Sequence, residues 1–158
     1  MQALLLGILV GVVAITAAVA PTTVERVEGS LQVRAAVPAS SFAVGVPIAI
    51  ALSIRNAAPV PVSVLFPSGQ RYDVIARRPR GDEVWRWSHD RAFIQVVQTV
   101  RLSPGEELAY RVTWDQRDLQ GRQVDPGTYE LVAIFLGQVE GSTRRQLTLS
   151  PLTITIKP

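Results

Sequence analysis

The chain has 158 residues, and its 16 Lys or Arg against 13 Asp or Glu give a formal net charge of only +3. It contains no cysteine, which excludes disulfides, thiolate zinc sites and iron–sulfur clusters. The basic residues are mostly interleaved with acidic ones instead of forming one basic stripe, so no nucleic-acid partner is expected. Apart from an apolar leader of roughly 20 residues, the length suits a single domain.

The N-terminal segment predicts a membrane element. Residues 3–20 are apolar and uncharged, and a helix of that length reaches about 27 Å, the short end for a bilayer span. No Lys or Arg precedes the run, and Pro21 follows the best small-residue cleavage site, Ala18–Ala20. We therefore expect residues 1–22 to be an uncleaved helical anchor, with a cleaved signal peptide and a secreted domain as the alternative. Because a lone N-terminal apolar segment usually serves export, we place the domain outside the cytoplasm, in a bacterial periplasm or at the cell surface.

Residues 23–158 show the alternation of apolar and polar residues that is typical of half-buried strands, and no window shows a sustained helical period. We predict an all-β domain of about eight or nine strands, arranged as an immunoglobulin-like antiparallel β-sandwich with Greek-key connections. The expected strands lie within residues 31–37, 48–54, 60–66, 72–76, 84–87, 96–102, 108–114, 129–135 and 147–156.

Proline and glycine mark the expected reversals. Ser103–Glu106 and Asp125–Thr128 both place Pro second and Gly third, the pattern of a type II turn. The apolar phase of the last strand slips by one residue at Ser150–Pro151. Proline cannot donate to a strand ladder, so we expect a bulge or a change of sheet there, on a sheet edge.

Four short blocks, in order along the chain, resemble the signatures of the intracellular proteinase inhibitor (BsuPI) family. They are Phe66–Asp73, Val84–Ser88, Leu102–Glu106 and Val124–Tyr129, and the similar region runs from about Val46 to Phe135. The resemblance implies an immunoglobulin-like sandwich from a family that takes its name from an inhibitor of an intracellular serine protease and whose domain is also used in exported and membrane-linked bacterial proteins. It assigns no reactive-site residue. We expect the motif residues to be structural: Phe66, Pro67, Ser68, Gly69, Tyr72, Asp73, Trp85, Trp87, Trp114, Asp115, Gly127 and Tyr129.

Several motif residues have a specific expected role. Trp85 and Trp87 share one strand face, so both should be buried together, whereas exposed indoles would indicate a carbohydrate-binding platform. Tyr129 follows a Pro-Gly pair and should bond nearby backbone through its hydroxyl, as in a tyrosine corner. Asp73 and Asp115 should accept hydrogen bonds from local backbone N–H groups.

Two polar loops are the candidate contact surfaces for a protein partner, because loops carry function in sandwiches more often than strand faces do. Neither predicts catalysis or a cofactor. Ser88, His89 and Asp90 are consecutive and cannot converge as a triad, and the spacing of Asp115, Asp118 and Asp125 does not fit an EF-hand calcium loop. The candidate contact residues are Ser88, His89, Asp90 and Arg91 in the first loop and Gln116, Arg117, Asp118 and Gln120 in the second.

These features favour a non-catalytic protein–protein interaction module, tethered through residues 3–20 as an accessory or scaffold subunit of a membrane complex. A proteinase inhibitor acting through an exposed loop, Ser88–Ala92 or Gln116–Gln123, is the first alternative. An extracellular carbohydrate-binding module is the second.

Overall fold

A computed structural model describes residues 20–158, and none of these residues is helical. The expected leader helix lies within residues 1–22 and falls almost wholly outside the described part. Within residues 20–158 no helix is long and apolar enough to cross a membrane.

The described chain consists of thirteen strands, several of them only two or three residues long. Their bounds are β1 Thr22–Glu28, β2 Leu31–Val37, β3 Ser41–Ala43, β4 Ile48–Asn56, β5 Val62–Phe66, β6 Tyr72–Arg77, β7 Glu83–Arg86, β8 Gln98–Leu102, β9 Glu107–Trp114, β10 Gly127–Phe135, β11 Gln138–Val139, β12 Leu147–Thr148 and β13 Leu152–Lys157. The prediction of an all-β domain is confirmed. The prediction missed β1, β3 and β11, because these segments carry few buried apolar residues.

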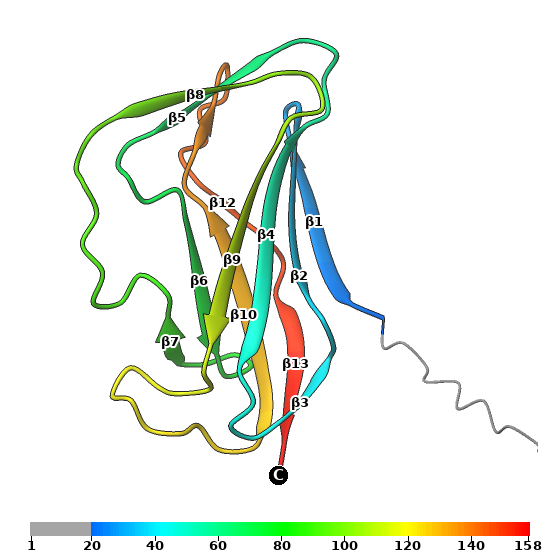
Figure 1. Ribbon diagram of the computed structural model, residues 1–158, viewed down its shortest axis with the longest axis vertical. Helices are drawn as coiled ribbons and strands as arrows, with labels where there is room; N and C mark the ends of the chain where they lie inside the picture. The colour runs from blue at the N-terminus through cyan, green and yellow to red at the C-terminus, as the bar shows by residue number, and fades with distance from the viewer. Residues whose placement is uncertain (1–19) are drawn as a thin grey trace, which may run out of the picture.

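The strands form three hydrogen-bonded sheets. One has the order β1-β2-β4-β9, the second has the order β3-β13-β10-β6-β7 with β12 also paired to β10, and the third has the order β11-β5-β8. The first two sheets face each other along the long axis of the molecule, and the third sheet lies at one end of it (Figure 1). Strand pairing is antiparallel except between β3 and β13, which run parallel, so the expectation of purely antiparallel sheets is wrong at that edge.

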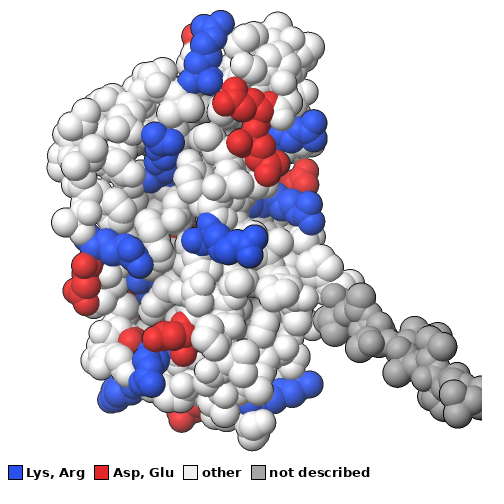
Figure 2. Space-filling view, in the orientation of Figure 1, with Lys and Arg blue, Asp and Glu red and all other residues white. Residues whose placement is uncertain are grey.

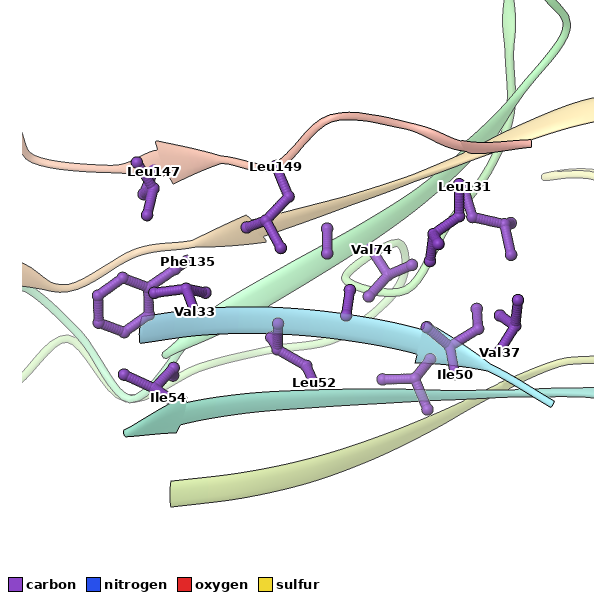
Figure 3. Packing of buried hydrophobic residues seen from close by; sticks show 14 of the residues in the cluster. Val33, Val37, Ile50, Leu52, Ile54, Val74, Leu131, Phe135, Leu147 and Leu149 are labelled. Atoms are coloured by element: carbon purple, nitrogen blue, oxygen red, sulfur yellow. The ribbon is translucent and has the colours of Figure 1, made fainter. Parts of the chain in front are cut away.

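One apolar core joins the three sheets. In β4, the side chains of Ile48, Ile50, Leu52 and Ile54 are buried while the residues between them are partly or fully exposed, as the alternation predicted. Side chains of β2 and β4 point towards those of β10 and of the segment after it, which Figure 3 shows from close by. Burial of these apolar side chains between the facing sheets is the main favourable contribution to the free energy of folding.

The two C-terminal strands, β12 and β13, lie on either side of Ser150–Pro151, where the sequence predicted an irregularity. The register of pairing with β10 shifts by one residue between the pair Leu131–Leu152 and the pair Ile134–Thr148, so the predicted bulge is present. The alternative, a change of sheet, does not occur, since β12 and β13 both pair with β10. The edge position is wrong for β13, which lies between β3 and β10.

The two Pro-Gly sequences behave differently. Gly105 has a φ of +76°, and the N–H of Glu106 donates to the carbonyl of Ser103 at 3.0 Å, as a type II turn requires. At Asp125–Thr128 the type II turn is not formed. Gly127 has a φ of +146° and already begins β10, and the carbonyl of Asp125 instead accepts a hydrogen bond from the hydroxyl of Tyr129.

The surface carries mixed charge. On the face drawn in Figure 2, Lys and Arg side chains alternate with Asp and Glu side chains, and no broad area of one sign is visible. Interleaving of this kind is what the sequence suggested. It differs from the single basic face typical of nucleic-acid binders.

Candidate functional site

The two candidate loops lie side by side. Together they line a shallow hollow of about 400 Å³, whose walls include Trp85, Trp87, His89, Arg117 and Leu119. A backbone hydrogen bond of 2.9 Å, from the N–H of Leu119 to the carbonyl of Val84, ties the second loop to β7. The two loops are separated in sequence by residues 92–115 and yet form one polar surface, which sequence alone did not indicate.

Asp73, at the start of β6, holds the first loop in place. Its buried carboxylate accepts hydrogen bonds from the backbone N–H groups of Val74 and Ser88, the hydroxyl of Ser88 and the guanidinium of Arg86, at 2.6–3.1 Å. Its predicted bonding to local backbone is confirmed. The hydroxyl of Ser88 is thereby directed to Asp73, and the imidazole of His89 instead contacts the exposed Asp90.

The guanidinium of Arg86 completes this anchor. It donates two hydrogen bonds to Glu83, at 2.9 and 2.7 Å, and a third to Asp73. The bonds to Glu83, and then those to Asp73, raise the pKa of Arg86 above its ordinary value despite partial burial. Arg86 is thus a permanently charged link between β7 and the base of the first loop.

Gln116 is not the exposed contact residue that the sequence suggested. Its side chain is 0% exposed. The amide donates to the carbonyls of Ala43 and Val46 and accepts from the N–H of Gly45. The residue also has a φ of +61°, which is uncommon for a side chain of this size. Gln116 therefore satisfies the backbone of the turn that follows β3, and its role is structural.

The rest of the second loop is organised by carboxylates. Asp118 accepts hydrogen bonds from the backbone N–H groups of Gln120 and Arg122 and from the Arg122 guanidinium, and the backbone bond of Arg122 contributes most to lowering the pKa of Asp118. Asp115 accepts from the N–H of Arg117 at 3.1 Å, which confirms its predicted local bonding. Arg117 and Gln120 are exposed, as predicted.

No group of three or more His, Cys, Asp or Glu side chains in residues 20–158 is arranged to hold a metal ion. Of the three carboxylates weighed for calcium, Asp118 and Asp115 bond within their own loop. Asp125 lies 3.8 Å from the guanidinium of Arg78.

The motif aromatics form a row of contacting rings. Tyr110 of β9 lies 4.6 Å from Tyr72 of β6, Tyr72 lies 4.4 Å from Trp87, and Trp87 lies 5.7 Å from Phe93, measured between ring centroids. Trp85 stacks on the fully buried Trp114 at 6.0 Å. Trp85 and Trp87 are only partly buried, which modifies the prediction of burial. Each packs against another ring on one side, and both line the hollow between the two loops.

Tyr129 makes the tyrosine-corner contact predicted from the sequence. Its hydroxyl donates to the carbonyl of Asp125 at 2.6 Å, and its ring packs against Trp114. The guanidinium of Arg78 lies 4.6 Å from the ring centroid. Burial is the main cause that raises the pKa of Tyr129, while Arg78 opposes this shift; burial likewise raises the pKa of Tyr72.

These tyrosines predict a loss of stability at alkaline pH. A raised pKa means that folding favours the neutral phenol, so the stabilisation is complete below the unfolded value of about 10 and is lost as pH rises through the higher folded value. We expect the free energy of unfolding, measured by urea denaturation, to fall steadily above about pH 10. Tyr72→Phe should reduce this pH dependence. A curve that stays flat between about pH 9 and 11 in the wild-type chain would contradict the assignment.

The sequence analysis missed the segment that follows the first loop. It placed Val96 on a strand face, whereas residues 91–97 form no strand and β8 begins only at Gln98. Ile94, Val96 and Val97 are all exposed. One signal was available: Phe93-Ile94 and Val96-Val97 are adjacent apolar pairs, and a strand of period two cannot bury both members of such a pair on one face.

Comparison with solved structures gives only distant likenesses. A β-glucosidase from Erythrobacter marinus (EmGH1) is 19% identical, with 87% of this chain and 16% of that chain covered and a TM-score of 0.41. The sporulation control protein Spo0M from Bacillus subtilis is 12% identical, with coverage of 83% and 51% and a TM-score of 0.44. The DNA glycosylase AlkC from Pseudomonas fluorescens is 17% identical, with coverage of 77% and 29% and a TM-score of 0.40. The aligned region thus spans from 16% to about half of these structures.

Comparison with curated proteins gives no match. Comparison with protein families, in contrast, gives a match over more than half of the chain. The model described as BsuPI, intracellular proteinase inhibitor, matches residues 35–140, a longer region than the resemblance from about Val46 to Phe135. All four sequence blocks lie within it. The chain therefore belongs to the BsuPI family of intracellular proteinase inhibitor domains.

Proposed function

We propose that residues 23–158 form an immunoglobulin-like sandwich that binds another protein without catalysing a reaction, and that the partner is a proteinase. The observation that carries this proposal is the family match over residues 35–140, since the family is described by proteinase inhibition. The paired loops support it, because they offer a contact surface next to a rigid β frame. This reverses the order of the two functions expected from sequence, where a membrane scaffold came first.

Inhibition by such a domain requires no catalytic residue. An inhibitor blocks the cleft by binding tightly and by keeping its contact loop in one conformation, so that little conformational entropy is lost on association. The hydrogen bonds of Asp73 and the row of rings that ends at Phe93 supply this kind of restraint. A carbohydrate-binding role is less well supported, because Trp85 and Trp87 are partly buried and each packs against a neighbouring ring.

The apolar residues 3–20 support a second, compatible proposal: the inhibitor domain is tethered to a membrane and faces the extracytoplasmic side, or is secreted after cleavage of the leader. A tethered domain could serve as an accessory subunit of a membrane complex. Purification from membranes with a stoichiometric companion protein, lost on deletion of residues 1–20, is the result expected for this role. Recovery as a free soluble monomer from intact cells would contradict it.

Titration of active serine endoproteinases with the full-length chain tests the main proposal. Subtilisin, elastase, chymotrypsin and trypsin form a suitable panel, because their primary pockets differ in size and charge. We expect at least one of them to lose activity at an end point of one chain per active site. Full residual activity of all four at micromolar chain would contradict the proposal. Heat-denatured chain controls for simple competition by a digestible substrate.

A further inference from the structure

The long connection between β7 and β8 exposes apolar side chains that the core does not use. Ile94, Val96 and Val97 are 62%, 55% and 64% exposed. The segment runs as an arc along the side of the molecule opposite to β1 and β13 (Figure 1). Concentrated exposure of apolar side chains on a soluble domain typically marks a binding surface.

The backbone of this segment is open as well. Within residues 20–158, no hydrogen bond engages the N–H or C=O groups of Val96 and Val97. They lead directly into β8, which among the strands of residues 20–158 pairs with β5 alone and is therefore an edge strand of its sheet. An extended segment with free backbone groups can pair with the main chain of a partner as an added strand, which is how peptide segments bind in many clefts.

The N-terminal part of the segment, residues 91–94, is nevertheless held in place by hydrogen bonds and a ring contact. The carbonyl of Ile94 accepts a hydrogen bond of 2.8 Å from the N–H of Gly69, and the guanidinium of Arg91 donates to the carbonyl of Trp87 at 2.7 Å. A Cβ atom at position 69 would lie 2.8 Å from Cγ1 of Ile94, so any larger residue there would force the side chain of Ile94 to move. Phe93 adds a ring contact with Trp87. The motif residues Gly69 and Trp87 thus support the segment.

We propose that residues 92–97 enter the substrate cleft of a serine endoproteinase in an extended, substrate-like conformation, with Val96 or Val97 in the primary specificity pocket; this rests on the proposed function. The residue in that pocket must present its carbonyl to the oxyanion hole. The carbonyl of Ile94 is already bonded to Gly69, whereas those of Val96 and Val97 are free. Valine suits a small apolar pocket of the elastase type.

Substitutions that change which proteinase is inhibited test whether Val96 or Val97 occupies the primary specificity pocket. Val96 and Val97 are each replaced by Phe, for the apolar slot of chymotrypsin, and by Arg, for the acidic pocket of trypsin, in the full-length chain. At one of the two positions we expect inhibition of the matching enzyme to strengthen by about tenfold or more, with inhibition of elastase or subtilisin weakened in parallel. Val27→Phe and Val27→Arg are the matched controls. Val27 is 59% exposed on β1, in another sheet, and its variants should leave the inhibition profile unchanged.

The outcomes separate the two proposals. If the wild-type chain inhibits a proteinase but no exchange at Val96 or Val97 alters the profile by more than about twofold, the loop assignment is overturned and the proposed function stands. If neither the wild-type chain nor any variant inhibits any of the four enzymes, the proposed function itself fails. If Val96→Asp and Val97→Asp abolish self-association of the chain and leave inhibition intact, the segment is a contact between copies and the assignment is again overturned. Unchanged thermal unfolding of each variant confirms that the fold is retained.

Discussion

Replacement of Trp114 by alanine should lower the free energy of unfolding by about 3–5 kcal/mol, the largest effect expected of any single side chain in the domain. Trp114 is fully buried at the end of β9, and its ring packs between those of Trp85 and Tyr129. Its indole N–H donates to the carbonyl of Arg117 at 2.9 Å. The substitution therefore creates a cavity and also releases the start of the second loop.

Urea denaturation followed by circular dichroism measures this effect. Trp114→Phe is the matched control, because it retains most of the buried ring and loses only the N–H bond and part of the volume; its loss should be clearly smaller. A loss below about 1 kcal/mol for Trp114→Ala would mean that the core beneath β7 is not packed as described.

Replacement of Asp73 by alanine should cost about 3 kcal/mol, and it should loosen the first loop. The substitution leaves the N–H of Ser88 without its acceptor and removes one of the two carboxylates that bind Arg86. Removing one partner from a buried charged network lowers the free energy of unfolding by more than the net contribution of the lost hydrogen bonds. The groups left behind are still shielded from water and no longer have a partner. Partial exposure of Arg86 and its bonds to Glu83 limit the loss.

Asp90→Asn is the control for Asp73→Ala. Asp90 lies in the same loop, with an exposed side chain that contacts His89, and its φ of +57° is one that asparagine also tolerates. This change should therefore alter stability by less than about 0.5 kcal/mol. Urea denaturation gives both values, and proteolysis of the 88–97 segment reports the loosening. Equal stability of the two variants would contradict the anchoring role of Asp73.

The β architecture could be predicted because burial on one face of a strand imposes an alternation that is visible in the sequence. Ile48, Ile50, Leu52 and Ile54 are the clearest case. Local bonds within a few residues were also predictable, as for Tyr129 with Asp125 and for Asp115 with Arg117. Each of these bonds joins residues only two to four positions apart in the sequence and needs no information about distant segments.

Contacts between distant segments could not be predicted in the same way. Gln116 looks like any polar loop residue, and only the fold brings the turn after β3 to its amide. The approach of the two candidate loops and the placement of β13 beside β3 likewise depend on sheet order. Val96, near the end of the 92–97 segment, was misassigned because it was counted towards the strand that begins only at Gln98.

Amide hydrogen exchange of the full-length chain, free and mixed with a proteinase of the panel that it is found to inhibit, tests the central proposal that the β sheets form a rigid frame and that the connection between β7 and β8 contacts the proteinase. The account predicts fast exchange at residues 92–97 in the free chain and strong protection of this segment in the complex, with little change in β2, β4 and β10. Protection confined to the outer face of the β1-β2-β4-β9 sheet, with residues 92–97 exchanging as fast as in the free chain, would contradict it.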